Sequence, residues 1–396
     1  MAHREIRTPA ELAAYCRGLV RCKSIALDTE FVAERSYRPV LCLVQVVADG
    51  EPALIDPLAA GDMTPFWAAL AEGAHETIVH AGRGEVEFCL EAVGRRPANL
   101  VDVQIAAGLA GIEYPAGYGT LITRLLKVSP DKHETRTDWR QRPLSKRQIE
   151  YAIEDVVHLP AVWEKLRERL RRLKRESWLA DEMEEWQSDI ERSRSQERWR
   201  RVSGNAGLSP RGLAVLRELW HWRESVAERR DCPSRRVLRD DLLIELARRQ
   251  SADPKRIGVV RGLERGDLKR QLPALAERVQ RALDLPEDDC PPRHTIPQTP
   301  PLSVLGQFLF AALGSYCRQN ELAPSMLGTP NDLRDLIAYR LGSGWPARER
   351  PPALARGWRA QVAGKLLDDL LAGRLAVRVG DPRSEHPLIV ERVDGQ

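Results

Sequence analysis

The sequence predicts an α/β domain over residues 1–165, followed by units built from helices. In the first part, short apolar runs alternate with stretches of helical periodicity, which is typical of strands interleaved with helices. In the rest of the chain, apolar residues recur at helical spacing. Charge divides at the same place: residues 1–165 hold 19 Lys and Arg against 23 Asp and Glu, whereas the remainder holds 42 against 34. An acidic front and a basic rear suggest that the rear binds a polyanion.

Composition excludes several classes of protein. The 396 residues suggest about two to four domains. The chain is 43% hydrophobic and 30% charged, which fits a soluble globular protein and not a disordered or collagen-like one. No stretch approaches the ~18 apolar residues of a membrane span, and charges interrupt the first twenty residues, so we expect neither membrane attachment nor a signal peptide. The 7 cysteines are scattered without a CxxC pair, which argues against disulfides and zinc and favours a cytoplasmic location.

The strands and helices of the front part follow from local patterns. We expect strands over 24–28, 40–47 and 77–80, the second being a nearly continuous apolar run that fits a strand covered on both faces. A helical stripe predicts a helix over 84–93. A longer helical region begins at Ser145, which forms a capping box with Gln148, and it bends or ends at Pro160.

The rear part is predicted to be helical in two units. Residues 166–206 are rich in charge and predict a solvated helical connector. Residues 207–286 predict a compact helical unit, and residues 287–301, rich in proline and acid, predict a linker. Residues 302–396 predict a second helical unit that ends in a small hairpin over 377–379 and 388–390.

Two acids at the end of the first strand suggest a metal site. Asp28 and Glu30 are two residues apart, so on a strand their side chains lie on the same face. Adjacent carboxylates repel unless a cation lies between them, and their oxygens suit Mg²⁺ or Mn²⁺. By themselves, however, acids at a strand end are often caps.

A second pair lies on the helix that begins at Ser145. Tyr151 and Asp155 are four residues apart and share a helix face, so the carboxylate could bind metal while the phenol orients a water. Glu154 lies roughly 100° away around the helix and is expected to face solvent. A half-buried tyrosine at this spacing is also common in an ordinary core.

Together the two pairs resemble the first and third motifs of the DEDD exonuclease superfamily, tyrosine subclass, and the surrounding sequence resembles the ribonuclease D family. The words that carry the likeness are 27–31 (LDTEF), 54–58 (LIDPL), 80–82 (HAG), 102–104 (DVQ), 135–145 (TRTDWRQRPLS) and 151–156 (YAIEDV). Residues 207–286 resemble the helical HRDC domain shared with RecQ-type helicases, and residues 302–396 a more divergent second one.

The resemblance implies a ribonuclease-H-like exonuclease domain with one or two HRDC domains, and metal-dependent 3′–5′ exoribonuclease activity. The RNA partners would be tRNA precursors or other structured RNA 3′ ends. Two divalent ions, Mg²⁺ or Mn²⁺, would act at the site: Asp28 bridges them, Glu30 and Asp155 complete the ion that holds the attacking water, and Tyr151 orients that water.

The sequence departs from the family in its second motif, where an Asp normally follows the His-Ala-Gly word. Glu85 occupies the matching position. Its extra methylene moves the carboxylate by about 1 Å, and misplacements of that size can cost on the order of 10²-fold in rate. We expect Glu85 to act in the site, as a weak ligand of the second metal or through its neighbours. Glu87 is the alternative, but it points elsewhere on a helix.

Further residues are candidates for contact with substrate: His80, Lys132, Trp139 and Arg140. Each has an ordinary structural explanation as well, since a strand-end histidine and a loop tryptophan often serve packing. Asp102 is expected to cap the helix that follows it.

Two other functions are compatible with the sequence. One is an RNA-binding adaptor whose nuclease site is weakened by Glu85. The other is a DNA 3′–5′ exonuclease linked to a helicase, although the chain has no helicase P-loop. Nothing in the sequence indicates an obligate protein partner, and the oligomeric state and natural RNA stay open.

Overall fold

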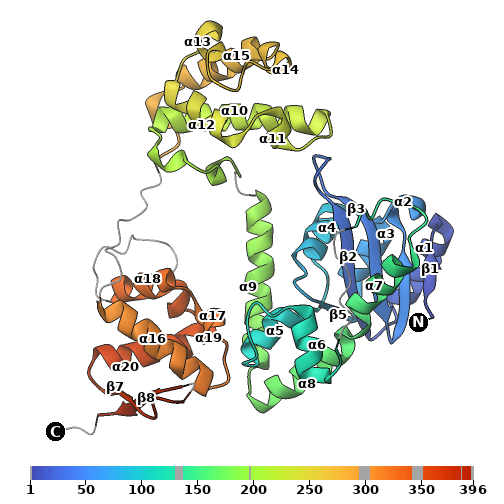
Figure 1. The fold of residues 1–396 in the computed structure, drawn as a ribbon, viewed down its shortest axis with the longest axis vertical. Coiled ribbons are helices and arrows are strands. Elements are labelled where there is room, and N and C mark those ends of the chain that lie inside the picture. Colours follow the sequence, from blue (N-terminus) through green and yellow to red (C-terminus); the bar gives the residue numbers. More distant parts are fainter. Residues whose placement is uncertain are drawn as a thin grey trace.

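The computed structural model describes residues 2–129, 137–195, 198–293, 304–340, 351–384 and 386–393. Figure 1 shows an α/β domain on one side of the long helix α9, a helical unit at the end of that helix, and a second unit of helices with a small hairpin on its other side. The predicted order of an α/β domain followed by helical units is therefore confirmed.

A six-stranded mixed sheet forms the centre of the α/β domain. Its strands are β1 (Arg4–Ile6), β2 (Ser24–Val32), β3 (Val40–Ala48), β4 (Glu51–Ile55), β5 (Glu76–Val79) and β6 (Leu100–Asp102). They lie in the order β1-β4-β3-β2-β5-β6. Strands β2, β3 and β4 are antiparallel, whereas β5 runs parallel to β2 and β6 to β5. Thus β2 lies inside the sheet, paired on both edges.

Three of these strands, β2, β3 and β5, fall where the sequence predicts them. Strands β1, β4 and β6 were missed. For β4 the sequence does carry a signal, the Asp49-Gly50 pair, and in the structure both residues have positive φ, 46° and 90°, as a two-residue hairpin turn requires.

Helices cover the sheet. Those of the α/β domain are α1 (Pro9–Leu19), α2 (Pro57–Ala60), α3 (Thr64–Glu72), α4 (Arg83–Val93), α5 (Val103–Leu109), α6 (Tyr118–Leu126) and α7 (Lys146–Val157). Helix α7 crosses β2, β3 and β4, which brings it next to the strand that carries Asp28 and Glu30 (Figure 1). The Ser145 hydroxyl accepts a hydrogen bond from the Gln148 amide at 3.2 Å and the Gln148 side chain accepts one from the Ser145 amide at 2.9 Å, so the predicted capping box is confirmed.

The prediction of a solvated connector over 166–206 is wrong. Helix α8 (Leu159–Arg172) runs across the expected boundary at residue 165, and Pro160 lies in its first turn. Helix α9 (Glu176–Ser195) buries Leu179, Met183 and Ile190 in the same apolar core as the sheet. Charged residues dominate this part of the sequence, so the apolar residues that line one face of the helix were not recognised as a buried stripe.

The first helical unit has its own core. It begins with two short 3₁₀ turns, Arg198–Arg201 and Asn205–Gly207, and continues with α10 (Pro210–Arg229), α11 (Ser234–Val237), α12 (Asp240–Arg249), α13 (Pro254–Gly258), α14 (Gly266–Lys269), α15 (Leu272–Leu283) and the 3₁₀ turn Glu287–Asp289. Arg223, only 5% exposed, ties α10 to α12 by a hydrogen bond of 2.6 Å to Asp240.

The C-terminal unit contains α16 (Val304–Gln319), α17 (Pro324–Leu327), α18 (Pro330–Arg340), a 3₁₀ turn (Ala353–Ala355), α19 (Gly357–Arg359), a π-helical turn (Ala360–Gly364), α20 (Lys365–Leu371) and the hairpin β7 (Leu375–Val379) and β8 (Leu388–Arg392). The hairpin confirms the predicted one. The HRDC-like character of this unit stays a prediction.

The C-terminal unit shares the apolar core of the α/β domain. The close contact uses glycines: a Cβ at Gly108 would lie 2.4 Å from the Met326 side chain, and one at Gly111 would lie 2.3 Å from the backbone of Glu321. Trp178 of α9 stacks on Trp358 with ring centroids 5.2 Å apart. Within the part of the chain that the structure describes, no helix is long and apolar enough to cross a membrane.

Removing the cap of α7 should destabilise the α/β domain. Ser145→Ala leaves the Gln148 amide without its partner and should cost about 1 kcal/mol, which lowers the melting temperature by about 2–4 °C for a domain of this size. Ser145→Thr retains the hydroxyl and is the control. Thermal unfolding followed by circular dichroism measures both, and an unchanged melting temperature for Ser145→Ala would contradict the capping role.

Candidate active site

Strand β2 supplies the first two acids of the site. Asp28 and Glu30 lie opposite Gln45 and Leu43 of β3, and both residues are half-buried. A bulge between Glu30 and Phe31 interrupts the register directly after them. Bulges of this kind bend a strand and are common beside active sites; here β2 stays paired with β3 beyond the bulge, as far as Val32.

Helix α7 brings the tyrosine and the third acid. Tyr151 and Asp155 are one turn apart and both half-buried, and a hydrogen bond joins the phenol to the Asp155 carboxylate. Burial is the largest cause that raises the pKa of Tyr151, and the charge of Asp155 and this hydrogen bond add to it. The phenol therefore stays protonated at neutral pH and acts as a donor. Glu154 points elsewhere and pairs with His158 at 3.5 Å.

Glu85 lies in the first turn of α4 and is 5% exposed. Its Oε1 accepts a hydrogen bond of 2.6 Å from the hydroxyl of Thr29, the residue between Asp28 and Glu30. Since side chains alternate along a strand, Thr29 points to the opposite face from the two acids, and it holds Glu85 at the edge of the acidic group. The alternative, Glu87, makes an exposed ion pair with Arg83 at 2.9 Å.

The turn before α4 fixes where that helix begins. Ala81 has a φ of 54°, unusual for a residue with a side chain, and its amide donates to Asp102 at 3.0 Å, as does that of Gly82. A Cβ at Gly82 would lie 2.3 Å from the Val79 side chain, so only glycine fits. Asp102 also accepts from the Gln104 amide at 2.8 Å; the predicted cap of α5 is confirmed, and the same carboxylate also organises the start of α4.

The acids interact electrically as one group. Burial, followed by the charges of Glu85, Asp155 and Glu30, raises the pKa of Asp28 well above its ordinary value. Burial and the charges of Asp155 and Glu85 raise the pKa of Glu30 to about 8. Burial raises the pKa of Glu85 to about 7, against the opposing effect of the Thr29 hydrogen bond. Four carboxylates from three separate elements are therefore close enough to influence one another electrostatically.

The chemistry of this donor set fits divalent metal ions. Carboxylate oxygens are the preferred ligands of Mg²⁺ and Mn²⁺, and a cation relieves the mutual repulsion that raises these pKa values. Over the residues that the structure describes, no three potential ligands are drawn together into a ready-made metal cage.

One residue near the acids was missed by sequence reasoning. Tyr118, at the start of α6, is half-buried; burial and the charges of Asp155 and Asp28 raise the pKa of its phenol. Its ring lies 5.6 Å from that of His80, and its hydroxyl donates to the Glu154 carbonyl at 3.3 Å. The available signal was weak: a tyrosine between two glycines, before a helix.

The residues predicted to contact substrate lie in different surroundings in the structure. His80 lies beside the site, but its Nε2 is 2.8 Å from the Ala116 carbonyl oxygen, so that nitrogen is engaged within the protein. Lys132 lies outside the described residues.

The predicted contact between Trp139 and substrate is not supported. Trp139 is 3% exposed and packs with Cys42, Ala152 and Ile153, and its ring centroid lies 6.0 Å from that of Tyr151. Burial leaves no face for a base, so its observed role is to support Tyr151. Arg140 is occupied by Asp138, with a hydrogen bond of 2.7 Å between side chains.

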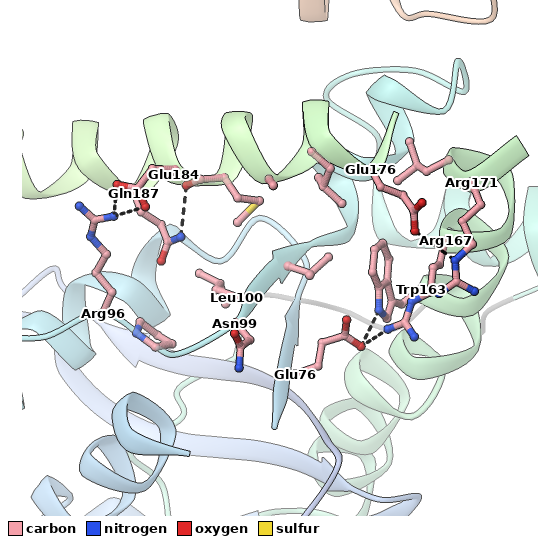
Figure 2. Close-up of a pocket in the computed structure, with 16 residues that line it drawn as sticks. Glu76, Arg96, Asn99, Leu100, Trp163, Arg167, Arg171, Glu176, Glu184 and Gln187 are labelled. Carbon is pink, nitrogen blue, oxygen red and sulfur yellow. Dashed lines mark hydrogen bonds and ion pairs between the residues drawn. The ribbon is translucent and has the colours of Figure 1, made fainter. Parts of the chain in front are cut away.

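A cavity of about 620 Å³ lies beneath α9, but none of the four acids lines it. Figure 2 shows its polar ends held by ion pairs: Arg96 with Glu184, and Arg167 with Glu76, which also accepts from the Trp163 indole. It lies beside Glu76 and Leu100 at the starts of β5 and β6, whereas His80 and Asp102 mark the other ends of these strands. Its arginines are neutralised by carboxylates, so the acidic group is the better candidate for phosphodiester chemistry.

Comparison with known proteins identifies the family. Residues 3–171 match the model of a 3′–5′ exonuclease domain, and residues 212–279 match that of the HRDC domain. Ribonuclease D of Zymomonas mobilis is 34% identical over 394 residues, which cover 95% of this chain and 96% of that protein. The chain belongs to the ribonuclease D family. Ribonuclease D of Gluconacetobacter diazotrophicus is also 34% identical, over 96% of this chain and 95% of that protein.

Solved structures agree. The crystal structure of Escherichia coli RNase D, described as an exoribonuclease involved in structured RNA processing, superposes with a TM-score of 0.78 at 27% identity, over 94% of this chain and 99% of that one. The ribonuclease D family member described here is accordingly a 3′–5′ exoribonuclease, as its sequence resemblance implied. Neither the RNA-binding adaptor nor the DNA exonuclease is favoured by these relatives.

Without metal, the acidic group should make stability fall as pH rises. The folded-state pKa of Glu30 is about 8 and that of Glu85 about 7, against an ordinary 4.5. Between these limits the folded protein binds more protons than the unfolded chain, so the free energy of unfolding decreases with pH and levels above about 8. Thermal unfolding in EDTA from pH 5 to pH 9 should show this decline.

Mg²⁺ should restore stability most at the upper end of that range, because it replaces the lost protons. Glu30→Gln, which cannot ionise, is the matched control and should flatten the decline. A melting temperature in EDTA that does not fall between pH 5 and pH 8 would contradict the shared acidic site.

Proposed function

We propose that this exoribonuclease removes nucleotides from the 3′ ends of structured RNA, such as tRNA precursors, at the acidic group of β2, α4 and α7. The observation that supports this most directly is the convergence of Asp28, Glu30, Glu85 and Asp155, since their mutual repulsion needs a cation. Exonucleases of this superfamily use divalent metal ions. For this chain we propose two, Mg²⁺ or Mn²⁺.

We assign the ligands as follows. Asp28, central in the group, would bridge the two ions, and Glu30 and Asp155 would complete the first. Glu85 would ligate the second weakly or act through its neighbours, because Thr29 already uses one of its oxygens. When bound, such a metal pair activates a water and stabilises the oxygen that leaves.

Tyr151 has a distinct role in this proposal. Its raised pKa makes it a poor base, so it orients the attacking water by hydrogen bonding and leaves deprotonation to other groups. The Asp155 carboxylate accepts a hydrogen bond from the phenol and thereby fixes the direction of its hydroxyl. Trp139 packs against the tyrosine ring and limits its movement.

The rear of the chain supports an RNA substrate. Residues 207–286 hold 18 Lys and Arg against 12 Asp and Glu. Arginine-rich surfaces bind phosphate through charge and release counterions, so this affinity should fall as salt rises. We propose that this unit binds structured RNA. The 7 cysteines are all free, which fits the proposed cytoplasmic location.

Digestion of end-labelled RNA tests the activity and its direction. With Mg²⁺ or Mn²⁺, a 5′-labelled RNA should give a ladder of shortening products, whereas a 3′-labelled RNA should release labelled mononucleotide at once. EDTA should stop both. Internal cuts, or activity that persists in EDTA, would overturn the proposal.

The acids of β2 and α7 should each be essential. Asp28→Asn and Asp155→Asn remove a charge that holds metal but keep the side-chain shape, so hydrolysis should fall below about 1% of wild type while the fold is retained. Glu154→Gln, on the same helix but facing away, is the control and should stay active. Near-wild-type cleavage by either Asn variant, with circular dichroism unchanged, would remove that residue from the site.

Two substitutions of Glu85 separate the effect of its side-chain length on activity from the effect of its charge. Glu85→Gln keeps the shape and removes the charge, so it should cost at least about tenfold in kcat, or ~1.4 kcal/mol of barrier. Glu85→Asp restores the side chain usual in the family and should raise the rate or lower the Mg²⁺ requirement if α4 keeps the family geometry. It should reduce activity if α4 instead lies farther from the other acids, because the shorter side chain would then not reach them. Glu87→Gln is the matched control; a wild-type rate for Glu85→Gln with both metals would exclude Glu85.

A further inference from the structure

The connection between β2 and β3 reaches out of the α/β domain to the first helical unit. Figure 1 shows the two strands extending toward α10 and α11. Strand β2 carries Asp28 and Glu30, so the same strand that positions the catalytic acids continues into a contact with another unit.

Tyr37 makes the first part of this contact. Its ring packs against the apolar core of the helical unit, its backbone amide donates to the Asp231 carboxylate at 3.1 Å, and its hydroxyl hydrogen-bonds Glu224. The ring, the hydroxyl and the backbone amide of Tyr37 all contact the same unit, so the contact is specific in geometry.

Arg38 makes the second part. Its guanidinium forms an ion pair with Glu91 of α4 and another, at 3.2 Å, with Glu228 of α10. One arginine in the β2–β3 connection thus contacts both the helix that carries Glu85 and the helical unit.

Helix α4 is held from a further direction as well. The Arg83 side chain donates to the Ser193 hydroxyl at 3.1 Å, and Arg194 donates to the Glu87 carbonyl at 2.8 Å, both from α9. Helix α4 is therefore held by α9 as well as by Arg38.

We propose that Tyr37 and Arg38 form a docking tip that holds the first helical unit in a fixed position beside the active site. They are positioning residues that set the preference for long over short RNA. The inference rests on the proposed binding of RNA by this unit. An RNA held by the unit presents its 3′ end to the acids at a high effective concentration only when the two parts keep a defined geometry. A short RNA that reaches only the acids gains nothing from the tip.

The strength of the contact suits such a role. Arg38 and Glu228 are about half exposed, and exposed ion pairs are individually weak. Loss of the tip should therefore shift the position of the unit without unfolding it, and the kinetic effect on long RNA should be moderate.

The test variant is Tyr37→Ala/Glu228→Ala, which removes the ring and the ion pair to α10 but leaves the acids untouched. For a structured RNA with a single-stranded 3′ tail, KM should rise about threefold to tenfold with kcat nearly unchanged. For a tetranucleotide, both constants should match wild type. Small-angle scattering should show a larger radius of gyration.

Two controls separate docking from other effects. Tyr37→Phe/Glu228→Gln keeps the ring and an acceptor for Arg38 but loses the hydroxyl bond to Glu224 and the ion pair, so its KM for the structured RNA should lie between those of wild type and the test variant. Glu245→Ala removes one acid from an exposed pair elsewhere on the same unit and should not raise KM.

The outcomes are distinct. A KM for the structured RNA equal to that of Glu245→Ala, or an equal loss on both substrates, would overturn the docking tip. If the wild-type enzyme shows no preference for the structured RNA, the proposed grip of the helical unit fails, and the docking tip, which rests on it, is overturned with it.

Discussion

The repulsion among Asp28, Glu30, Glu85 and Asp155 is the constraint on which the rest of the structure depends. Bringing four carboxylates together is unfavourable in the absence of a cation, as the raised pKa of Asp28 shows. The fold must hold them there through contacts made elsewhere. The apolar β2 and β3, paired along most of their length, provide the rigid base.

Glu85 and Asp155 are positioned by polar contacts of residues that are not themselves among the four acids. Thr29 fixes Glu85, and Asp102 fixes the turn at Ala81 and Gly82 from which α4 starts. On the other side, the capping box at Ser145 sets the start of α7 and so the height of Asp155 above β2. These polar groups fix the positions of the acids. Such positioning matters because small displacements in an active site strongly reduce the rate.

The helical parts are joined to this site more closely than a chain of separate domains would be. Helix α9 is buried against the α/β domain on one side and carries contacts to the C-terminal unit, such as Trp178 on Trp358, on the other. The first helical unit keeps a core of its own, yet Tyr37 lies against it. The chain therefore combines a C-terminal unit that shares the core of the α/β domain with a helical unit that has its own core and contacts that domain through Tyr37.

The sequence by itself determined the α/β class, the two acid pairs, the capping box and the two helical units, because these depend on local spacing and periodicity. Only the tertiary structure decided what lies between elements far apart in the chain. It showed that Glu85 accepts a hydrogen bond from Thr29, that Trp139 is buried and lies near the ring of Tyr151, and that Tyr118 lies close to the acids. It also showed α9 to be part of the core, since a single apolar stripe is recognisable only once its partner surface is known. Contacts across 56 residues, as between Thr29 and Glu85, leave no periodic trace in a single sequence.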